Sequence, residues 1–130
     1  MTEPYLISFD QFGDTSVGYI SVSEYEKEVP FPIQRVFWTY KTPETVIRGN
    51  HANLINKEVL VAIQGEIKVT TINSRSEKSI FILDSPTQGL YLPPNIWLTL
   101  EYSDDAIQLV LASEKYNEKD YIRNHQEFTS

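Results

Sequence analysis

The stretch Arg48–Gly65, RGNHANLINKEVLVAIQG, sets the expected fold of this chain. It begins with a polar segment that carries Arg48 and His51, which we expect to be a loop, and it continues into the apolar run Val59–Ile63 before Gln64–Gly65. A short apolar run that is bounded by turn residues predicts a buried β-strand. A loop that leads into such a strand can hold side chains at the mouth of a barrel, because the strand supplies rigidity and the loop supplies reach.

The rest of the chain repeats this pattern of short strands. Arg35–Tyr40 is dense in residues that suit a pleated sheet. Glu66–Ile72 alternates, so that Ile67, Val69 and Thr71 share one face. Further strands are predicted at Tyr5–Phe9, Val17–Val22, Ser79–Leu83, Leu90–Leu92, Trp97–Glu101 and Ala106–Ala112.

Turn residues separate these strands. We expect turns at Gly13–Asp14 and Asn73–Ser76, an extended connection at Pro30–Pro32, and loops at Ser23–Val29 and Lys41–Val46. Helix is expected only in the tail, as one or two turns within Asn117–Asn124. About ten short strands with regular turn signals predict a β-sandwich or β-barrel. We therefore expect one all-β domain over residues 1–130, with a short C-terminal arm.

Composition limits the class of protein. The chain has 130 residues and is 41% hydrophobic, which is enough for a folded core. Its formal net charge is −7. Since affinity for nucleic acid comes largely from clustered lysine and arginine, a nucleic-acid-binding function is not expected.

The chain contains no cysteine, so a disulfide framework, a thiolate nucleophile and a cysteine-ligated zinc are excluded. The N-terminal residues lack the basic and apolar regions of a signal peptide, and no segment has the ~20 apolar residues that a membrane span needs. We expect a cytoplasmic protein with no membrane association.

Four runs of sequence carry a resemblance to a known family. They are RGNHAN (48–53), KEVLVAIQGEIKV (57–69), LDSPTQGLYLPPNIW (83–97) and LVLASEKYNEKDYIRNHQEF (109–128). Together they resemble the cupin family of nucleotide-sugar 3,4-ketoisomerases, the WxcM-like group, which converts dTDP-4-keto-6-deoxyglucose to its 3-keto isomer. The resemblance extends from about Pro30 to Phe128, and its most specific part is the C-terminal run.

The resemblance implies a cupin-type double-stranded β-helix, or jelly-roll barrel, that forms a homodimer and binds a dTDP-linked sugar at its mouth. It also implies tautomerisation without a metal or cofactor: a base removes the C3 proton, an enediol forms, and a proton returns at C4. Such chemistry needs a base of near-neutral pKa, an acid, and donors on the enediolate oxygens. The N-terminal strand, the arm Val29–Pro32 and the C-terminal arm are candidates to cross to the second subunit.

The chain departs from the family pattern at several positions. The family has two histidines one residue apart, and here the first is His51 while Asn53 occupies the second position. The family commonly has histidine directly after the tryptophan, where this chain has Leu98. A family Arg-Gly pair reads Val17–Gly18, and the family glutamine before Val-Leu-Val is Glu58.

These residues give a predicted site. His51 is the expected base, assisted by Glu58 or Tyr91, because histidine titrates near neutral pH and a buried glutamate has a raised pKa. The predicted substrate-binding residues are Arg35, Arg48, Asn53, Tyr40 and Trp97. An arginine suits bidentate binding of a diphosphate, while the aromatic residues could equally be packing residues of the core or rim.

A metal site is not expected, and two other interpretations remain open at this point. A metal-binding cupin needs three or four convergent ligands, and only His51 and Glu58 fit that pattern, so we expect no metal. The loss of titrating residues allows a cupin that binds a nucleotide sugar without turnover, or a partner subunit. An epimerase on the same barrel would use His51 as base and Tyr91 as acid.

Overall fold

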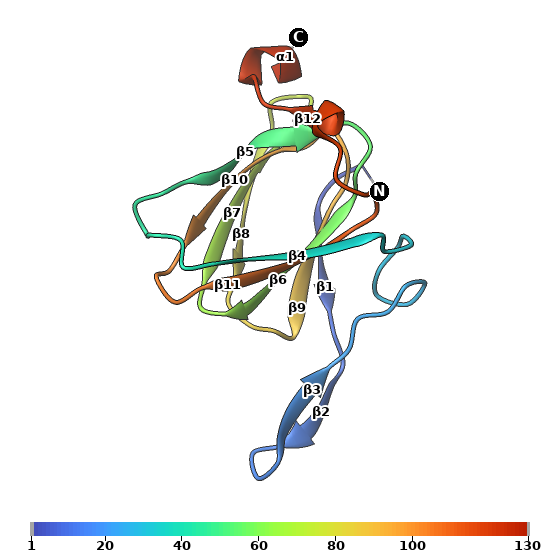
Figure 1. Ribbon diagram of the computed structural model, residues 1–130, viewed down its shortest axis with the longest axis vertical. Helices are drawn as coiled ribbons and strands as arrows, with labels where there is room; N and C mark the ends of the chain where they lie inside the picture. The colour runs from blue at the N-terminus through green and yellow to red at the C-terminus, as the bar shows by residue number, and fades with distance from the viewer. Residues whose placement is uncertain (1, 130) are drawn as a thin grey trace.

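The computed structural model describes residues 2–129, which form twelve β-strands and a short C-terminal helix (Figure 1). One five-stranded antiparallel sheet has the order β1 (Tyr5–Ser8), β9 (Gln88–Leu92), β6 (Glu58–Gln64), β11 (Ile107–Ala112), β4 (Arg35–Tyr40). The second has the order β12 (Tyr121–Ile122), β5 (Arg48–Asn53), β10 (Trp97–Tyr102), β7 (Ile67–Ile72), β8 (Lys78–Leu83). The predicted all-β jelly-roll fold is confirmed.

Alternation along the strands fills the space between the two sheets. Leu60 and Ala62 of β6 face Leu98 and Leu100 of β10, and the other buried members of this core are Ile67, Val69, Leu83, Leu90, Leu92, Ile96, Tyr102, Ala106 and Val110. Each fully buried Leu or Val stabilises the fold by ~1.5–3 kcal/mol. The same alternation turns Glu58 inward, two residues before Leu60, so the strand that builds the core also places a carboxyl inside the barrel.

A second apolar cluster covers the outer face of the first sheet. Val29 and Phe31 are buried there against Val59, Tyr91 and the start of the chain. The segment that contains Pro30 and Pro32 therefore packs on its own barrel, with Phe31 and Tyr91 ring centroids 6.3 Å apart. Within this chain the arm Val29–Pro32 therefore covers part of the outer face of the first sheet.

The hairpin of β2 (Gln11–Asp14) and β3 (Gly18–Ser21) projects away from the barrel (Figure 1). The turn that we predicted at Gly13–Asp14 is wrong, because both residues belong to β2 and the chain reverses over residues 15–17. The Asp14 carboxylate accepts a hydrogen bond from the backbone N–H of Ser16 at 2.8 Å. This bond stabilises a turn that follows Asp14, whereas Gly13 had suggested a turn at residues 13–14.

The segment Arg48–Asn53, which we predicted to be a loop, is strand β5. Gly49 and Asn50 are poor strand formers, and they have φ angles of +83° and +56°. They form an irregularity in the pairing with β10, where Leu98 lies opposite His51 but Thr99 lies opposite Gly49. Cross-strand pairing therefore outweighs the low strand propensity of these residues.

The tail also differs from the prediction. Within Asn117–Asn124 the chain forms a single 3₁₀ turn at Glu118–Asp120 and then β12, which pairs with the end of β5. The α-helix α1 spans His125–Thr129. In the part of the chain that the structure describes, no helix has the length and apolar character needed to cross a membrane.

Candidate active site

The irregularity in β5 brings two functional side chains to one face. In a regular strand, Arg48 and His51 would point to opposite sides of the sheet because they are three residues apart. The extra residue at Gly49–Asn50 shifts the alternation by one, as a β-bulge does, and both side chains then line the barrel interior. Gly49 is required there because a Cβ atom would lie 2.9 Å from the Leu98 carbonyl oxygen.

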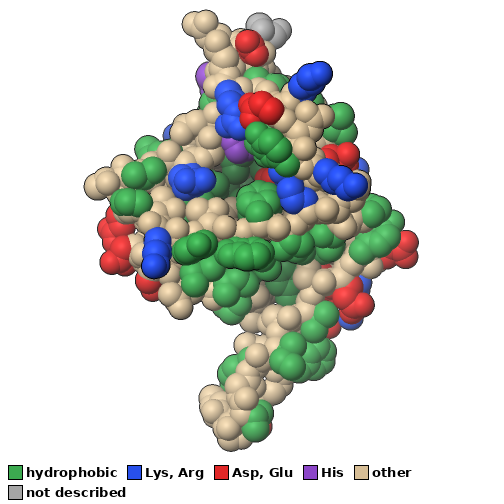
Figure 2. Space-filling view, in the orientation of Figure 1, with side chains coloured by type: hydrophobic (Ala, Val, Ile, Leu, Met, Phe, Trp, Pro, Cys, Tyr) green, Lys and Arg blue, Asp and Glu red, His purple; other side chains and the backbone are tan. Residues whose placement is uncertain are grey.

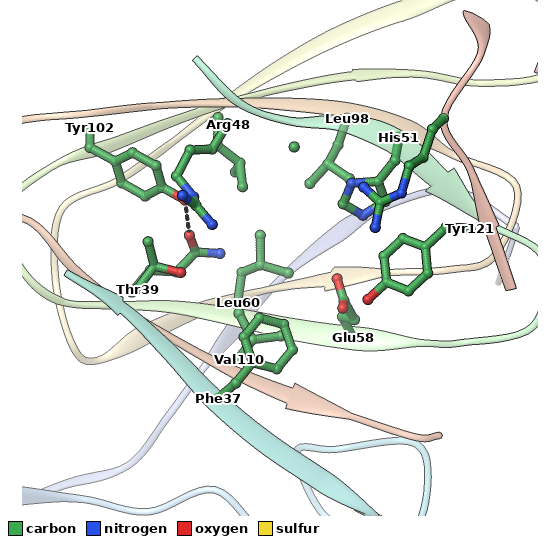
Figure 3. A pocket seen from close by; sticks show the side chains of 14 residues that line it. Phe37, Thr39, Arg48, His51, Glu58, Leu60, Leu98, Tyr102, Val110 and Tyr121 are labelled. Carbon is green, nitrogen blue, oxygen red and sulfur yellow. Dashed lines mark hydrogen bonds between the residues drawn. The ribbon is translucent and has the colours of Figure 1, made fainter. Parts of the chain in front are cut away.

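These side chains line a cavity of about 220 Å³ between the two sheets (Figure 3). Its walls come from β4, β5, β6, β10, β11 and the C-terminal arm: Phe37, Thr39, Arg48, Gly49, His51, Glu58, Leu60, Leu98, Leu100, Tyr102, Gln108, Val110, Tyr121 and Arg123. Figure 3 shows His51, Glu58 and Tyr121 at one end, which we call the titrating end. Arg48, Thr39 and Tyr102 lie at the other, which we call the donor end.

His51 lies at the titrating end of the cavity. Its ring packs 4.9 Å from the ring of Tyr121, centroid to centroid, and its Nδ1 is buried. Burial lowers the pKa of His51, and the nearby positive charge of Arg123 adds to the effect. At neutral pH the imidazole is therefore neutral and able to take up a proton.

Glu58 faces the same space from the first residue of β6. Its side chain is buried, and burial raises its pKa from an ordinary 4.5 to about 7. The charge of Arg35 and a hydrogen bond from Asn56 Nδ2, at 3.1 Å, act in the opposite direction. The carboxyl is thus partly protonated at neutral pH, a state that a surface glutamate does not reach.

The two shifts reverse the usual order of titration. An ordinary glutamate loses its proton below an ordinary histidine, but here the glutamate pKa has risen and the histidine pKa has fallen. Between the two values the dominant state is a neutral imidazole beside a carboxylic acid. That state supplies one base and one acid in a single cavity, which is the requirement for moving a proton between adjacent carbon atoms.

The donor end is built from groups that keep their protonation state. The Tyr102 hydroxyl donates a hydrogen bond to Gln108 Oε1, and burial raises the Tyr102 pKa to about 12. Arg48 and Thr39 lie beside this hydroxyl (Figure 3). Because arginine stays charged at all ordinary pH values, this end can bind an anion or a polarised oxygen but cannot shuttle a proton.

The C-terminal arm forms one wall of the cavity. The Arg123 guanidinium lies 4.6 Å from the Tyr121 ring centroid and makes two bonds to Glu118, Nε–Oε2 at 2.7 Å and NH2–Oε1 at 2.9 Å. The Tyr116 hydroxyl also donates to Glu118 Oε1, at 2.7 Å. Arg123 keeps the Tyr121 ring in place over His51 and adds a positive charge to the rim.

Asp120 anchors this arm to the barrel. Its buried carboxylate accepts hydrogen bonds from Asn53 Nδ2 at 3.0 Å, the Ile55 N–H at 2.7 Å and the Asn56 N–H at 3.2 Å. The Leu54 N–H donates to the Asp120 carbonyl at 2.8 Å. Asn53 is therefore engaged with Asp120 and does not line the cavity.

Five of the predicted site residues lie outside the cavity wall, and one of these, Arg35, lies just beside it. Tyr91 is between Leu90 and Leu92, which face the core, so its own side chain lies on the outer face, 4.9 Å from the ring of Tyr5. The remaining three are Tyr40, exposed on the outer face of β4, Trp97, packed edge-on against His125, and Asn53. The interpretation of Tyr91 as an acid beside His51 is wrong, because strand parity points it away from the cavity.

Sequence reasoning missed several residues that the barrel brings together. Tyr121 and Arg123 belong to the C-terminal run that carried the family resemblance, but no role had been inferred for them. Arg35, by contrast, was predicted to bind substrate and lies just beside the cavity, with its guanidinium carbon 5.1 Å from the Phe37 ring centroid and its buried Nε without a partner in the described residues. The other residues missed were Thr39, Tyr102 and Gln108, each on a different strand.

The charge at the cavity is opposite to that of the chain as a whole. Three of the four arginines, Arg35, Arg48 and Arg123, lie in or beside it, although the net charge is −7. Figure 2 shows Lys and Arg side chains gathered on this face. The face suits an anionic ligand. Among residues 2–129, no three His, Asp or Glu side chains lie close enough together to hold a metal ion.

Comparisons with known proteins agree on one family. The family model FdtA: WxcM-like, C-terminal matches residues 2–130. The chain is 35% identical, over 127 residues, to TDP-4-oxo-6-deoxy-alpha-D-glucose-3,4-oxoisomerase from Aneurinibacillus thermoaerophilus, covering 97% of this chain and 90% of that protein.

Solved structures give the same result. QdtA from Thermoanaerobacterium thermosaccharolyticum, a sugar 3,4-ketoisomerase in complex with TDP, matches with a TM-score of 0.92 and 32% identity, over 97% of this chain and 91% of that chain. WlaRA from Campylobacter jejuni, a TDP-fucose-3,4-ketoisomerase, matches with a TM-score of 0.90 and 30% identity, over 97% of this chain and 93% of that chain.

Proposed function

This chain belongs to the WxcM-like FdtA family, and from that premise we propose that it is a 3,4-ketoisomerase of a TDP-linked 4-keto-6-deoxyhexose. The structural observation that supports this function best is the pair His51 and Glu58, whose pKa values are shifted toward each other in one cavity. A cavity that only bound a sugar would not need this pair. The non-catalytic alternative is therefore not favoured, and the relatives described above are isomerases.

The proton transfers can be assigned to the two groups. Neutral His51 takes the hydrogen from C3, and the negative charge that develops on the C4 oxygen is stabilised by donors of the cavity. The C3 hydroxyl proton passes to the C4 oxygen, and protonated Glu58 delivers a proton to C4. Transfer of a proton from imidazolium to carboxylate then restores the starting pair. The substrate is rearranged with no net gain or loss of electrons.

In this proposal the arginines of the cavity bind the substrate. Arg48 and Arg123 line the cavity and present planar guanidinium groups, which match the oxygen geometry of a diphosphate. Arg35 has a buried Nε–H that no described residue accepts, and a ligand oxygen would satisfy it. We propose that these arginines hold the nucleotide diphosphate so that C3 and C4 of the sugar reach His51 and Glu58. Asn53, Tyr40 and Trp97 receive no direct role in this arrangement.

Proton NMR in deuterated water tests this function. With dTDP-4-keto-6-deoxyglucose, the wild-type protein should exchange the C3 proton and produce a new 3-keto signal, and His51→Ala should lose both. An epimerase would exchange protons beside the ketone without moving it, and that result would replace the proposed function. Absence of exchange in the wild-type protein with any TDP-linked 4-keto sugar would refute it.

We further propose that the protein works as a homodimer. The projecting β2–β3 hairpin exposes apolar side chains that the barrel does not cover, including Val17, which is 80% exposed (Figure 2). Trp38 adds a 61% exposed side chain on the outer face of β4. Exposed apolar surface of this kind is typical of an interface between subunits. A monomer in light scattering at micromolar concentration would contradict the proposal. A cytoplasmic location also stays a prediction.

A further inference from the structure

Asn56 lies in the loop between β5 and β6, buried to 2% exposure, with both ends of its amide engaged. Its Oδ1 accepts a hydrogen bond from the backbone N–H of Glu114 at 3.1 Å, and its Nδ2 donates to Glu58 Oε2 at 3.1 Å. The two ends of an amide are chemically different, because only the oxygen can accept from a backbone N–H. The amide group therefore has a single orientation, with its NH₂ toward Glu58.

This orientation has a consequence for the carboxyl of Glu58. Because Oε2 accepts the Asn56 bond whether or not the carboxyl is ionised, the acid proton resides on Oε1. Oε1 has no hydrogen-bond partner in the described residues, and the carboxyl lies at the titrating end with His51 and Tyr121 (Figure 3). Resting on the proposed function, we propose that Asn56 is a positioning residue that makes Glu58 exchange its proton with the substrate through Oε1.

The surroundings of Asn56 are rigid enough for this role. Its backbone N–H is bound to the Asp120 carboxylate, which also holds the Ile55 N–H. Ser113 Oγ accepts the N–H of Lys57 at 2.9 Å, on the other side of the loop. Side chains that orient a functional group in this way are themselves held by buried bonds, as positioning requires.

The variant Asn56→Asp removes the amide donor. It is isosteric and keeps an oxygen for the Glu114 N–H, but it replaces the amide NH₂ beside Glu58 by a second carboxyl oxygen. We expect kcat to fall about tenfold with KM unchanged, because the acid proton loses its fixed position. The alkaline limb of the pH profile should move up by about one pH unit, because the carboxylate loses its hydrogen bond.

Two comparisons separate positioning from a general loss of structure. Asn73→Asp alters another buried asparagine with a similar network at the β7–β8 turn, far along the chain from the cavity residues, and should leave the pH limb in place. In a Glu58→Gln background, Asn56→Asp should lower kcat by no more than about twofold, because its effect acts through Glu58. A tenfold fall in that background, or an unmoved limb, would overturn the proposal.

A measurement on the wild-type protein tests the role of Asn56 even if Asn56→Asp does not fold, and this measurement needs no substrate. The side-chain amide resonances of Asn56 should shift with the same midpoint as the carboxyl carbon of Glu58 when pH is varied by NMR. Amide resonances that stay constant while Glu58 titrates would overturn the role of Asn56. Since no turnover is involved, this outcome is distinct from failure of the isomerase function.

Discussion

The two ends of the cavity are built from different kinds of side chain. At the titrating end, burial raises the pKa of Glu58 to about 7 and lowers the pKa of His51. At the donor end, Tyr102 has a pKa of about 12 and Arg48 is permanently charged. On the proposed function, the difference separates two tasks, proton transfer and the binding of fixed negative charge. Substitutions at the two ends should therefore change different kinetic constants.

The largest effect is expected from His51→Ala. Removal of a positioned general base lowers kcat by ~10²–10⁴-fold, because the C3 hydrogen then has only water to accept it. KM should stay within about threefold of wild type, since the arginines that bind the diphosphate are untouched. Steady-state kinetics with a coupled or NMR assay would measure this. An equal loss in kcat and gain in KM would place His51 in binding instead.

Glu58→Gln should have the next largest effect. Glutamine has the shape of the protonated acid but cannot release a proton, so we expect kcat to fall on the order of 10²-fold. The wild-type pH profile of kcat/KM should show an alkaline limb near pH 7, the pKa of Glu58, and this limb should be absent in the variant. A limb that persists in Glu58→Gln would assign it to another group.

Arg48→Lys tests the donor end. Lysine keeps the charge but loses the planar pair of donors, so KM should rise about tenfold while kcat changes little. Lys68→Arg, on β7 outside the cavity wall, serves as a control for a change of cation on a surface strand and should leave both constants unchanged. A fall in kcat without a change in KM would mean that Arg48 acts on the transition state rather than on the diphosphate.

A further effect is on stability and depends on pH. Since the folded-state pKa of Glu58 is about 7, above its ordinary 4.5, its contribution to stability is fully present below pH 4.5 and is lost as pH rises through 7. Glu58→Gln removes this dependence. At pH 8 the variant should be more stable than wild type by about 3 kcal/mol, and at pH 4 the two should be equal. Urea unfolding at both pH values measures the difference.

How far the sequence could predict this site depended on the residue. The alternation of Ile67, Val69 and Thr71 was sufficient to place one face of β7 in the core, as the structure confirms. The prediction for Tyr91 was wrong because the direction of its side chain depends on a one-residue alternation. A short run that is apolar throughout does not reveal which of its residues face the core. Periodicity locates a strand more reliably than it locates the faces of a strand that is apolar throughout.

No local sequence pattern could have predicted that Thr39, Tyr102 and Gln108 lie together at the donor end. Thr39, Tyr102 and Gln108 lie on three strands and meet only because the barrel closes. His51 was found because it matches the first histidine of the family pattern, and Glu58 because its position departs from that pattern. The bulge at Gly49–Asn50 was read as a loop, since its composition is that of a loop.

The anchoring of the β5–β6 loop by Asp120 also determines the order in which the protein can be completed during synthesis. The loop donors at Asn53, Ile55 and Asn56 emerge from the ribosome well before the carboxylate that accepts from them, 64 to 67 residues later. Until Asp120 has been made, these loop donors have no carboxylate to bind, so a chain that stops before residue 120 lacks the anchor at this end of the cavity.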